Sequence, residues 1–99
     1  MLFATVYTPR ENTTEEAQKR GLQLFTNWKL PEGFEFKAHY SRADGNGGIA
    51  IVEASSAAAL FEGVAPWVPF LHFETSPVID VMEGVPISMR VNAWRDSVG

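Results

Sequence analysis

The chain contains no cysteine, so disulfides, thiolate nucleophiles, cysteine-rich zinc sites and iron–sulfur ligation are all excluded. Basic residues are also few: the eight lysines and arginines are scattered, and the formal net charge is −4. Nucleic acids are bound through concentrated basic surfaces, so we expect no nucleic-acid partner. The chain has neither an apolar run of membrane-spanning length nor a basic leader followed by a signal-peptide core. We therefore expect a cytoplasmic protein without membrane contact.

The remaining composition is that of one folded domain. The chain has 99 residues, of which 45% are hydrophobic, and it includes three Trp, two Tyr and seven Phe. This is enough apolar material for one core, and no linker or internal repeat divides the chain. We expect a single domain over residues 1–99.

The segment Gly47–Ala54 is the most strand-like part of the chain, because two glycines lead into an uninterrupted apolar run. Ile49 and Ile51 fall on one face of an extended strand, and Ala50 and Val52 fall on the other. A strand that is apolar on both faces is typical of a sheet covered on both sides. This pattern predicts a central strand.

Periodicity predicts the other elements. Alternating or β-branched segments predict strands at residues 2–8, 34–41 and 70–79, and helical spacing of apolar residues predicts helices at about 13–28 and 57–64. Pro77 favours an edge position for the last strand, because proline donates no hydrogen bond to a ladder. Pro86 at a first-turn position predicts a terminal helix that begins there, although residues 85–91 also alternate as in a strand.

Local motifs mark the helix starts and one turn. Thr13, with Glu16 three residues later, has the pattern of a capping box, and Ser55 and Ser56 offer a cap to the second helix. The run 42–48 contains Asp-Gly and Asn-Gly, which supply the positive φ that a tight reversal needs. The two flanking strands are therefore predicted to form a hairpin. A phosphate-binding loop is a poorer account of these glycines, since no helix follows them.

The order of elements predicts an α+β, ferredoxin-like βαββαβ sandwich with a C-terminal helix. In this topology strands one and three are central, strands two and four lie at the edges, and both main helices cover one face. The other face stays open although it is expected to carry Phe3, Ile49 and Ile51. We expect a second copy to cover it, sheet on sheet, in a homodimeric α+β barrel, with the tail helix free to reach across.

Four segments resemble a known family: Met1–Arg10, Gly47–Ala54, Trp67 with Phe70–Val78, and Ala93–Asp96. Together they resemble the bacterial and phage family called domain of unknown function 3303, over almost the whole chain. That family is similar to the dimeric α+β-barrel superfamily, whose ferredoxin-like subunits pair through their open sheet faces. The superfamily includes cofactor-free monooxygenases, muconolactone isomerases, and haem-degrading and chlorite-decomposing proteins, but none of their catalytic motifs is recognisable here. The resemblance thus implies a fold and a dimer rather than a particular chemistry.

The alternation of side chains along the strands defines a candidate pocket inside the expected barrel. With Ile49 and Ile51 facing the interior, Glu53 faces it as well. The aromatic residues of the second strand, together with Ala38 and Tyr40, are expected beneath the helices, so that the intervening residues point inward. The candidate pocket residues are Tyr7, His39, Glu53, His72, Glu74 and Trp67. Phe3, Thr5 and Lys37 are expected on the same inward face.

An apolar cleft with a few convergent polar groups is typical of a small-ligand site, and an imidazole beside a carboxylate is suited to general-base catalysis. Either His39 or His72 would be the base, assisted by Glu53, Glu74 or Tyr7. Histidines on edge strands more often lie at a solvent rim, so a structural role stands beside the catalytic one. The two histidines share no ligand spacing, and we expect neither a metal site nor haem nor another cofactor.

Aromatic residues at core spacing are expected to pack rather than to hold a cofactor: Phe25, Trp28, Phe34, Phe36 and Phe61. Trp67, in a connector between two prolines, is suited either to closing the pocket or to sealing the dimer. Trp94, in the terminal segment, is suited to a partner contact. The sequence therefore predicts a homodimeric barrel that binds an apolar or aromatic small molecule. A cofactor-free monooxygenase or isomerase and a structural or partner-binding module are the alternatives.

Overall fold

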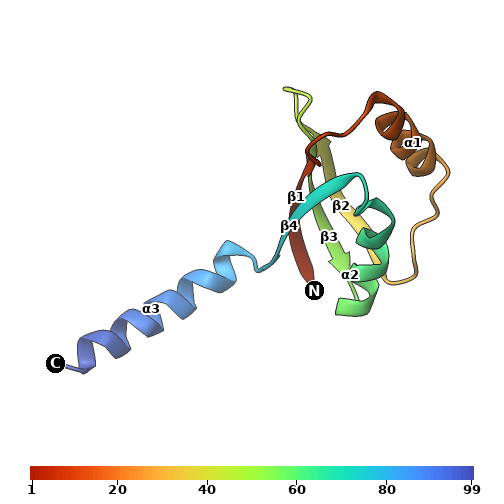
Figure 1. Cartoon of the computed structure of the whole chain (residues 1–99). Coiled ribbons are helices and arrows are strands. Elements are labelled where there is room, and N and C mark those ends of the chain that lie inside the picture. Colours follow the sequence, from red (N-terminus) through yellow and green to blue (C-terminus); the bar gives the residue numbers. More distant parts are fainter.

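One antiparallel sheet organises the computed structural model, which describes residues 1–99. Its strands are β1 (Leu2–Pro9), β2 (Phe34–Ser41), β3 (Gly48–Ala54) and β4 (Leu71–Val78), in the order β2-β3-β1-β4. Helices α1 (Glu15–Thr26) and α2 (Ala57–Val64), followed by the short 3₁₀ helix η1 (Ala65–Trp67), lie on one side of the sheet (Figure 1). The predicted ferredoxin-like βαββαβ order with a C-terminal helix, α3 (Val81–Ser97), is confirmed. So are the central and edge positions of the strands.

The local sequence explains where the main helices begin. The Thr14 hydroxyl oxygen accepts the N–H of Ala17 at the start of α1, and Ser56 caps α2 in the same way. The capping-box prediction placed the first cap one residue too early, at Thr13. That hydroxyl instead donates to the carbonyl of Arg10, in the turn that leads into the helix.

The predicted hairpin joins β2 to β3 through the glycine-rich turn. Gly45 and Gly47 adopt positive φ angles of 75° and 96°, which side chains other than glycine rarely tolerate. The N–H of Arg42 donates to the carbonyl of Gly47 at 2.9 Å, and the N–H of Asn46 donates to the Asp44 carboxylate at 3.0 Å. These bonds close the reversal at the position that the Asp-Gly and Asn-Gly pairs predicted.

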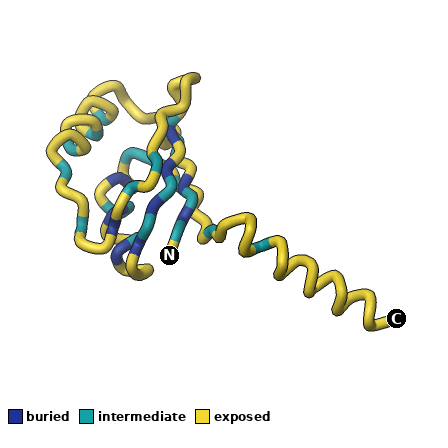
Figure 2. The backbone as a smooth tube through the Cα atoms, turned by 180° about the vertical axis from the view of Figure 1, so that it is seen from behind, coloured by how far each residue is buried: buried dark blue, intermediate teal, exposed yellow.

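The hydrophobic core lies on the helix-facing side of the sheet. Its buried members are Phe3, Phe34, Ala50, Val52, Ala54 and Ala59. In Figure 2 the buried positions concentrate in the strands and in the segments packed on them, whereas α3 is exposed along nearly its whole length. The open side of the sheet has no cover from this chain.

The pairing of β1 with β3 corrects one prediction. Thr5 lies opposite the buried Ala50, so Phe3, Thr5 and Tyr7 face the helices. Sequence alternation predicted these three residues on the open face beside Ile49. Alternation shows which residues of one strand share a face, but the register between strands decides which face of the neighbour they join.

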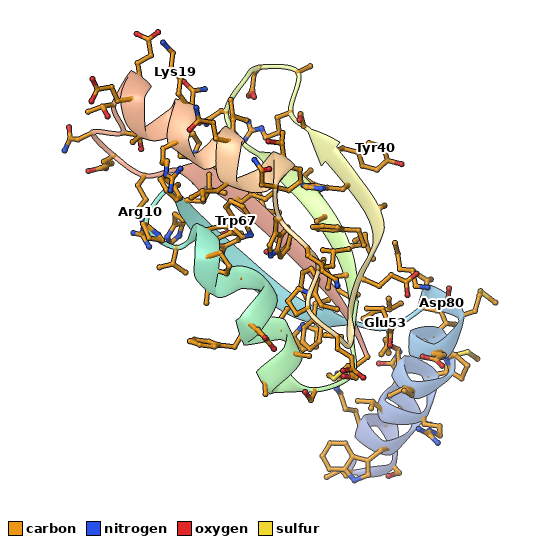
Figure 3. The ribbon with its side chains drawn as sticks, turned by 90° about the vertical axis from the view of Figure 1, so that its right-hand side faces the viewer. Arg10, Lys19, Tyr40, Glu53, Trp67 and Asp80 are labelled. Carbon is orange, nitrogen blue, oxygen red and sulfur yellow. The ribbon has the colours of Figure 1, made fainter.

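A β-bulge in β2 corrects a second prediction. The register with β3 shifts between Phe36 and Ala38, so Lys37 is an extra residue in the strand. The alternation therefore reverses after it. His39 lies on the helix side, and Tyr40 points away from α1 and α2 (Figure 3). The prediction that His39 faces the open side, with Ala38 and Tyr40 beneath the helices, is wrong for this reason.

α3 begins earlier than predicted and leaves the body of the domain. The Asp80 carboxylate caps it by accepting the N–H of Met82 at 2.7 Å, so Pro86 lies inside the helix and not in its first turn. No residue of α3 is buried. The radius of gyration is 17.7 Å, compared with about 13 Å for a compact domain of this length. Neither α3 nor any other helix combines the length and apolarity needed to cross a bilayer.

Candidate functional site

A cavity of about 630 Å³ lies between the sheet and the helices α1 and α2. Small-molecule sites typically measure about 300–1,000 Å³. No residue of α1 is buried, although α1 lines the cavity, so this helix stands off the sheet instead of packing closely on it. Five of the cavity's nine solvent-exposed lining residues gather near the start of α1 and the β2–β3 turn, where the cavity opens: Thr13, Gln18, Ser41, Arg42 and Gly45. The other four exposed lining residues are Pro9, Leu22, Phe25 and His39.

Aromatic rings form the walls of this cavity. The ring centroids of Trp28 and Trp67 are 5.1 Å apart in an edge-to-face contact, and Phe25 lies 5.6 Å from Trp67. On the sheet side, Phe36 stacks on His39 with centroids 4.5 Å apart and an interplanar angle of 14°. Phe25 also lies 5.9 Å from His39, which joins the two groups of rings. A planar apolar molecule would find ring faces and edges on several sides.

Tyr7 and His39 form the polar pair of the cavity. The Tyr7 hydroxyl oxygen and His39 Nε2 are 2.7 Å apart. Burial raises the pKa of the Tyr7 phenol and lowers the pKa of the His39 imidazole, because burial disfavours the charged form of each group. Both groups therefore favour their neutral forms. The bond holds one proton, donated either by the phenol or by the ring nitrogen, so the pair can offer a ligand a donor or an acceptor.

Gly48 makes this pair possible. Tyr7 is on β1 and His39 is on β2, and β3 lies between them. Gly48 pairs directly with Tyr7, and a β-carbon at Gly48 would collide with the Tyr7 hydroxyl and ring. At the neighbouring Gly47 a β-carbon would collide with the Tyr7 backbone. The turn signal in the sequence explains the positive φ of Gly47 but not the second role of Gly48, which is to leave room for the phenol.

Trp67 lines the cavity and carries a buried, unpaired N–H. The residue is 8% exposed, and its Nε1 is the one buried side-chain nitrogen or oxygen without a hydrogen-bond partner. Figure 3 shows Trp67 between α1 and α2. A buried donor without a partner costs about 1–3 kcal/mol. Nε1 itself has almost no accessible surface, so a ligand oxygen would reach this N–H only after the surrounding side chains shift.

The structure divides the six predicted pocket residues between the two faces of the sheet. Three of them line the cavity on the helix side: Tyr7, His39 and Trp67. The other three, Glu53, His72 and Glu74, lie on the open face, where they pair across the ladders with alternate residues of β1. The sheet therefore separates the two groups, which do not form one site in a single chain.

The open-face group makes its own contacts. The carboxylate of Glu53 pairs with the N-terminal amine of Met1, and His72 Nε2 lies 3.9 Å from Glu74 Oε1. Nowhere does the structure bring together three or more His, Asp or Glu side chains in a way that could hold a metal ion.

The walls of the cavity were not predicted from the sequence. Trp28 and Phe36 pack against the core as predicted, but together with the half-exposed Phe25 they also line the cavity. Phe61, also predicted in the core, is 73% exposed. A stripe of apolar residues on a helix predicts which side faces the sheet, but it carries no signal of how far the helix stands from it.

These features define a small ferredoxin-like α+β domain with an aromatic-walled cavity between its sheet and its helices. Residues 1–92 match the family described as Domain of unknown function (DUF3303), and the chain belongs to this family. The match covers the whole sheet, the cavity and most of α3. No curated protein matches the chain at a significant level.

Proposed function

We propose that the protein binds a small, planar, mostly apolar molecule that carries a hydrogen-bond acceptor, in the cavity between the sheet and α1 and α2. The observation that carries this proposal is the aromatic-walled cavity of about 630 Å³, which contains the Tyr7–His39 pair and is lined by Trp67 with its unpaired N–H. Fifteen of the 26 lining residues are hydrophobic, so most of the ligand surface would meet apolar groups. The few polar groups would fix its orientation.

The charge of the lining favours a neutral ligand. Arg42, at the mouth, is the one lysine, arginine or carboxylate side chain in the lining, and its guanidinium pairs with Asp44. Burial raises the pKa of Tyr7 and lowers the pKa of His39, so both side chains favour their neutral forms near neutral pH. An ionised group placed among these rings would lose its hydration without gaining a partner.

Two probes of nearly equal size test this proposal. 2-Acetonaphthone carries one carbonyl oxygen, and 2-ethylnaphthalene carries none. We expect the ketone to bind about fivefold more tightly, since a hydrogen bond contributes about 1 kcal/mol. Titration calorimetry measures both affinities, and Trp67→Phe is expected to remove the difference. Failure of wild-type protein to bind either probe at millimolar concentration would overturn the proposal.

The Tyr7–His39 bond favours a second candidate function, that of a cofactor-free isomerase or monooxygenase. With its pKa lowered by burial, His39 is unprotonated at neutral pH and available as a base. Tyr7 lies 2.7 Å away and is placed to pass its own proton to His39 as its oxygen takes one from a bound molecule. His72 lies on the other side of the sheet and takes no part in this scheme.

Proton exchange tests the second candidate with the same ketone. In D₂O, a base in the cavity would accelerate exchange of the methyl protons of 2-acetonaphthone, which NMR follows directly. His39→Gln is expected to abolish the acceleration, and His72→Gln is expected to leave it unchanged. Equal exchange rates with wild-type protein and His39→Gln would remove His39 as a catalytic residue, while the binding proposal would stand.

We also propose that the protein is a homodimer that covers the open sheet face. Val6, Tyr40 and Ile49 lie together on this face and are 38%, 69% and 43% exposed. Large apolar surfaces of this kind usually mark an interface. Sedimentation equilibrium at micromolar concentration is expected to give twice the mass of one chain. A single-chain mass over the whole concentration range would exclude the dimer.

A further inference from the structure

We infer that α3 of each copy lies on the open sheet face of a second copy of this chain. The inference rests on the homodimer proposed above and specifies the element that makes the contact. Its starting point is the position of α3, which projects from the end of β4 without touching the covered side of the sheet (Figure 1). It exposes large apolar side chains to water along its length.

These apolar residues form two stripes on opposite sides of the helix. Successive residues of a helix are about 100° apart, so residues three or four positions apart share a side. One stripe covers the N-terminal part of α3, and the other covers the C-terminal part. The N-terminal stripe consists of Val81, Met82, Val85 and Met89, and the C-terminal stripe of Ile87, Val91 and Trp94; all seven are 39–76% exposed. A helix that is apolar on both sides is typically buried on both sides. A single chain offers α3 no such cover.

The C-terminal stripe is out of reach of its own sheet. Trp94 lies 14 residues beyond the cap at Asp80, which is about 20 Å along a straight helix. The long dimension of the molecule, 61 Å compared with 30 and 20 Å for the others, reflects this extension. As long as α3 extends away from its own domain, a surface that covers Trp94 must come from another molecule.

Charge complementarity identifies that surface. The centre of the open face is apolar, and acidic side chains lie at its margins: Glu35 and Glu53 at one end, where Lys37 and the Met1 amine pair with them, and Glu74 on β4. Glu74 has only His72 near it, 3.9 Å away, so this margin offers a carboxylate to a cation of a partner. The C-terminal stripe of α3 is flanked by Arg90 on one side and Arg95 on the other. An apolar stripe edged by arginines matches an apolar face edged by carboxylates.

A charge-swap experiment tests the inference. One full-length variant combines Arg90→Glu with Arg95→Glu, and the other combines Glu35→Arg with Glu74→Arg. All four side chains are exposed, with Glu35 at 65% and Glu74 at 80%, so circular dichroism is expected to show both variants folded. Each variant alone would oppose like charges and is expected to dissociate at least tenfold more readily than wild type. The two mixed are expected to form a hetero-pair, because every α3 then meets a sheet of opposite charge.

The outcomes separate this inference from the dimer itself. Rescue on mixing supports contact between α3 and the other copy, since a helix folded back on its own sheet would stay mismatched in the mixture. If both variants form stable homodimers, or if mixing them does not restore pairing, the placement of α3 is overturned while the wild-type dimer stands. If wild-type protein shows only single chains, the dimer and this inference fall together, and the ligand cavity is unaffected.

Discussion

The Tyr7 hydroxyl occupies the space that a β-carbon of residue 48 would need, and Gly48 lies directly opposite Tyr7 in the ladder of β1 and β3. This arrangement lets the phenol extend over β3 and meet His39 on β2 at 2.7 Å. A glycine at the start of the central strand thus determines whether the cavity has its polar pair.

We predict that Gly48→Ala lowers the free energy of unfolding by about 1–3 kcal/mol, the usual cost of overpacking. The added methyl group would displace the Tyr7 ring and break its bond to His39. Urea denaturation measures the stability. Gly84→Ala is the control, because a β-carbon there meets only Ile79 at 3.7 Å, and alanine favours a helix over glycine. Equal stability of Gly48→Ala and wild type would show that the ring moves at no cost.

The fold could be predicted from the sequence because its signals are local. The two-sided apolar run around Ile49 and Ala50 marks a central strand, and the Asp-Gly and Asn-Gly pairs place the hairpin. The assignment of residues to the two faces was less accurate, because it depends on pairing between distant segments. One extra residue, Lys37, reverses the alternation after Phe36, and nothing in the alternating pattern of β2 announces it.

The sequence predicted a different site from the cavity that the structure contains. Strand alternation assigned Tyr7 and His39 to a pocket on the open face, whereas the structure places them, with Trp67, at the cavity on the helix side. The cavity itself could not be predicted, because the apolar stripe of α1 is the same for a helix that packs tightly and for one that stands off the sheet. Glu53 was grouped with them by alternation alone, and the register of β1 with β3 puts it on the other face.

The lowered pKa of His39 predicts a specific pH dependence of stability. Below the ordinary histidine pKa of about 6.5, the unfolded chain binds a proton that the folded chain takes up only at lower pH. The His39 contribution to the free energy of unfolding is therefore complete above about pH 7 and decreases as the pH falls through this window. Urea denaturation between about pH 5.5 and 7.5 measures this slope. His39→Gln is expected to flatten it; identical slopes for wild type and His39→Gln would contradict the prediction.

The two faces of the sheet are expected to serve separate purposes. Ile49→Glu places a charge among Val6 and Tyr40 on the open face and is expected to weaken the proposed dimer at least tenfold, because a buried unpaired charge is strongly disfavoured. The cavity lies on the other side, so the affinity for 2-acetonaphthone should change less than twofold. Sedimentation and calorimetry on the same samples compare the two effects. A parallel loss of ligand affinity would show that the cavity depends on the dimer.

Trp67→Phe is expected to change stability and ligand binding in opposite directions. The substitution removes the unpaired Nε1–H and retains an aromatic ring in the cavity wall, so the ligand-free protein should be as stable as wild type or more stable. The same change should reduce the affinity for 2-acetonaphthone about fivefold and leave that for 2-ethylnaphthalene nearly unchanged. Trp28→Phe is the matched control, since Trp28 lines the same cavity without a buried unpaired N–H, and it should affect both probes alike. Thermal unfolding and calorimetry measure the two quantities. A loss of stability together with equal loss of both probes would mean that the indole of Trp67 serves only to pack.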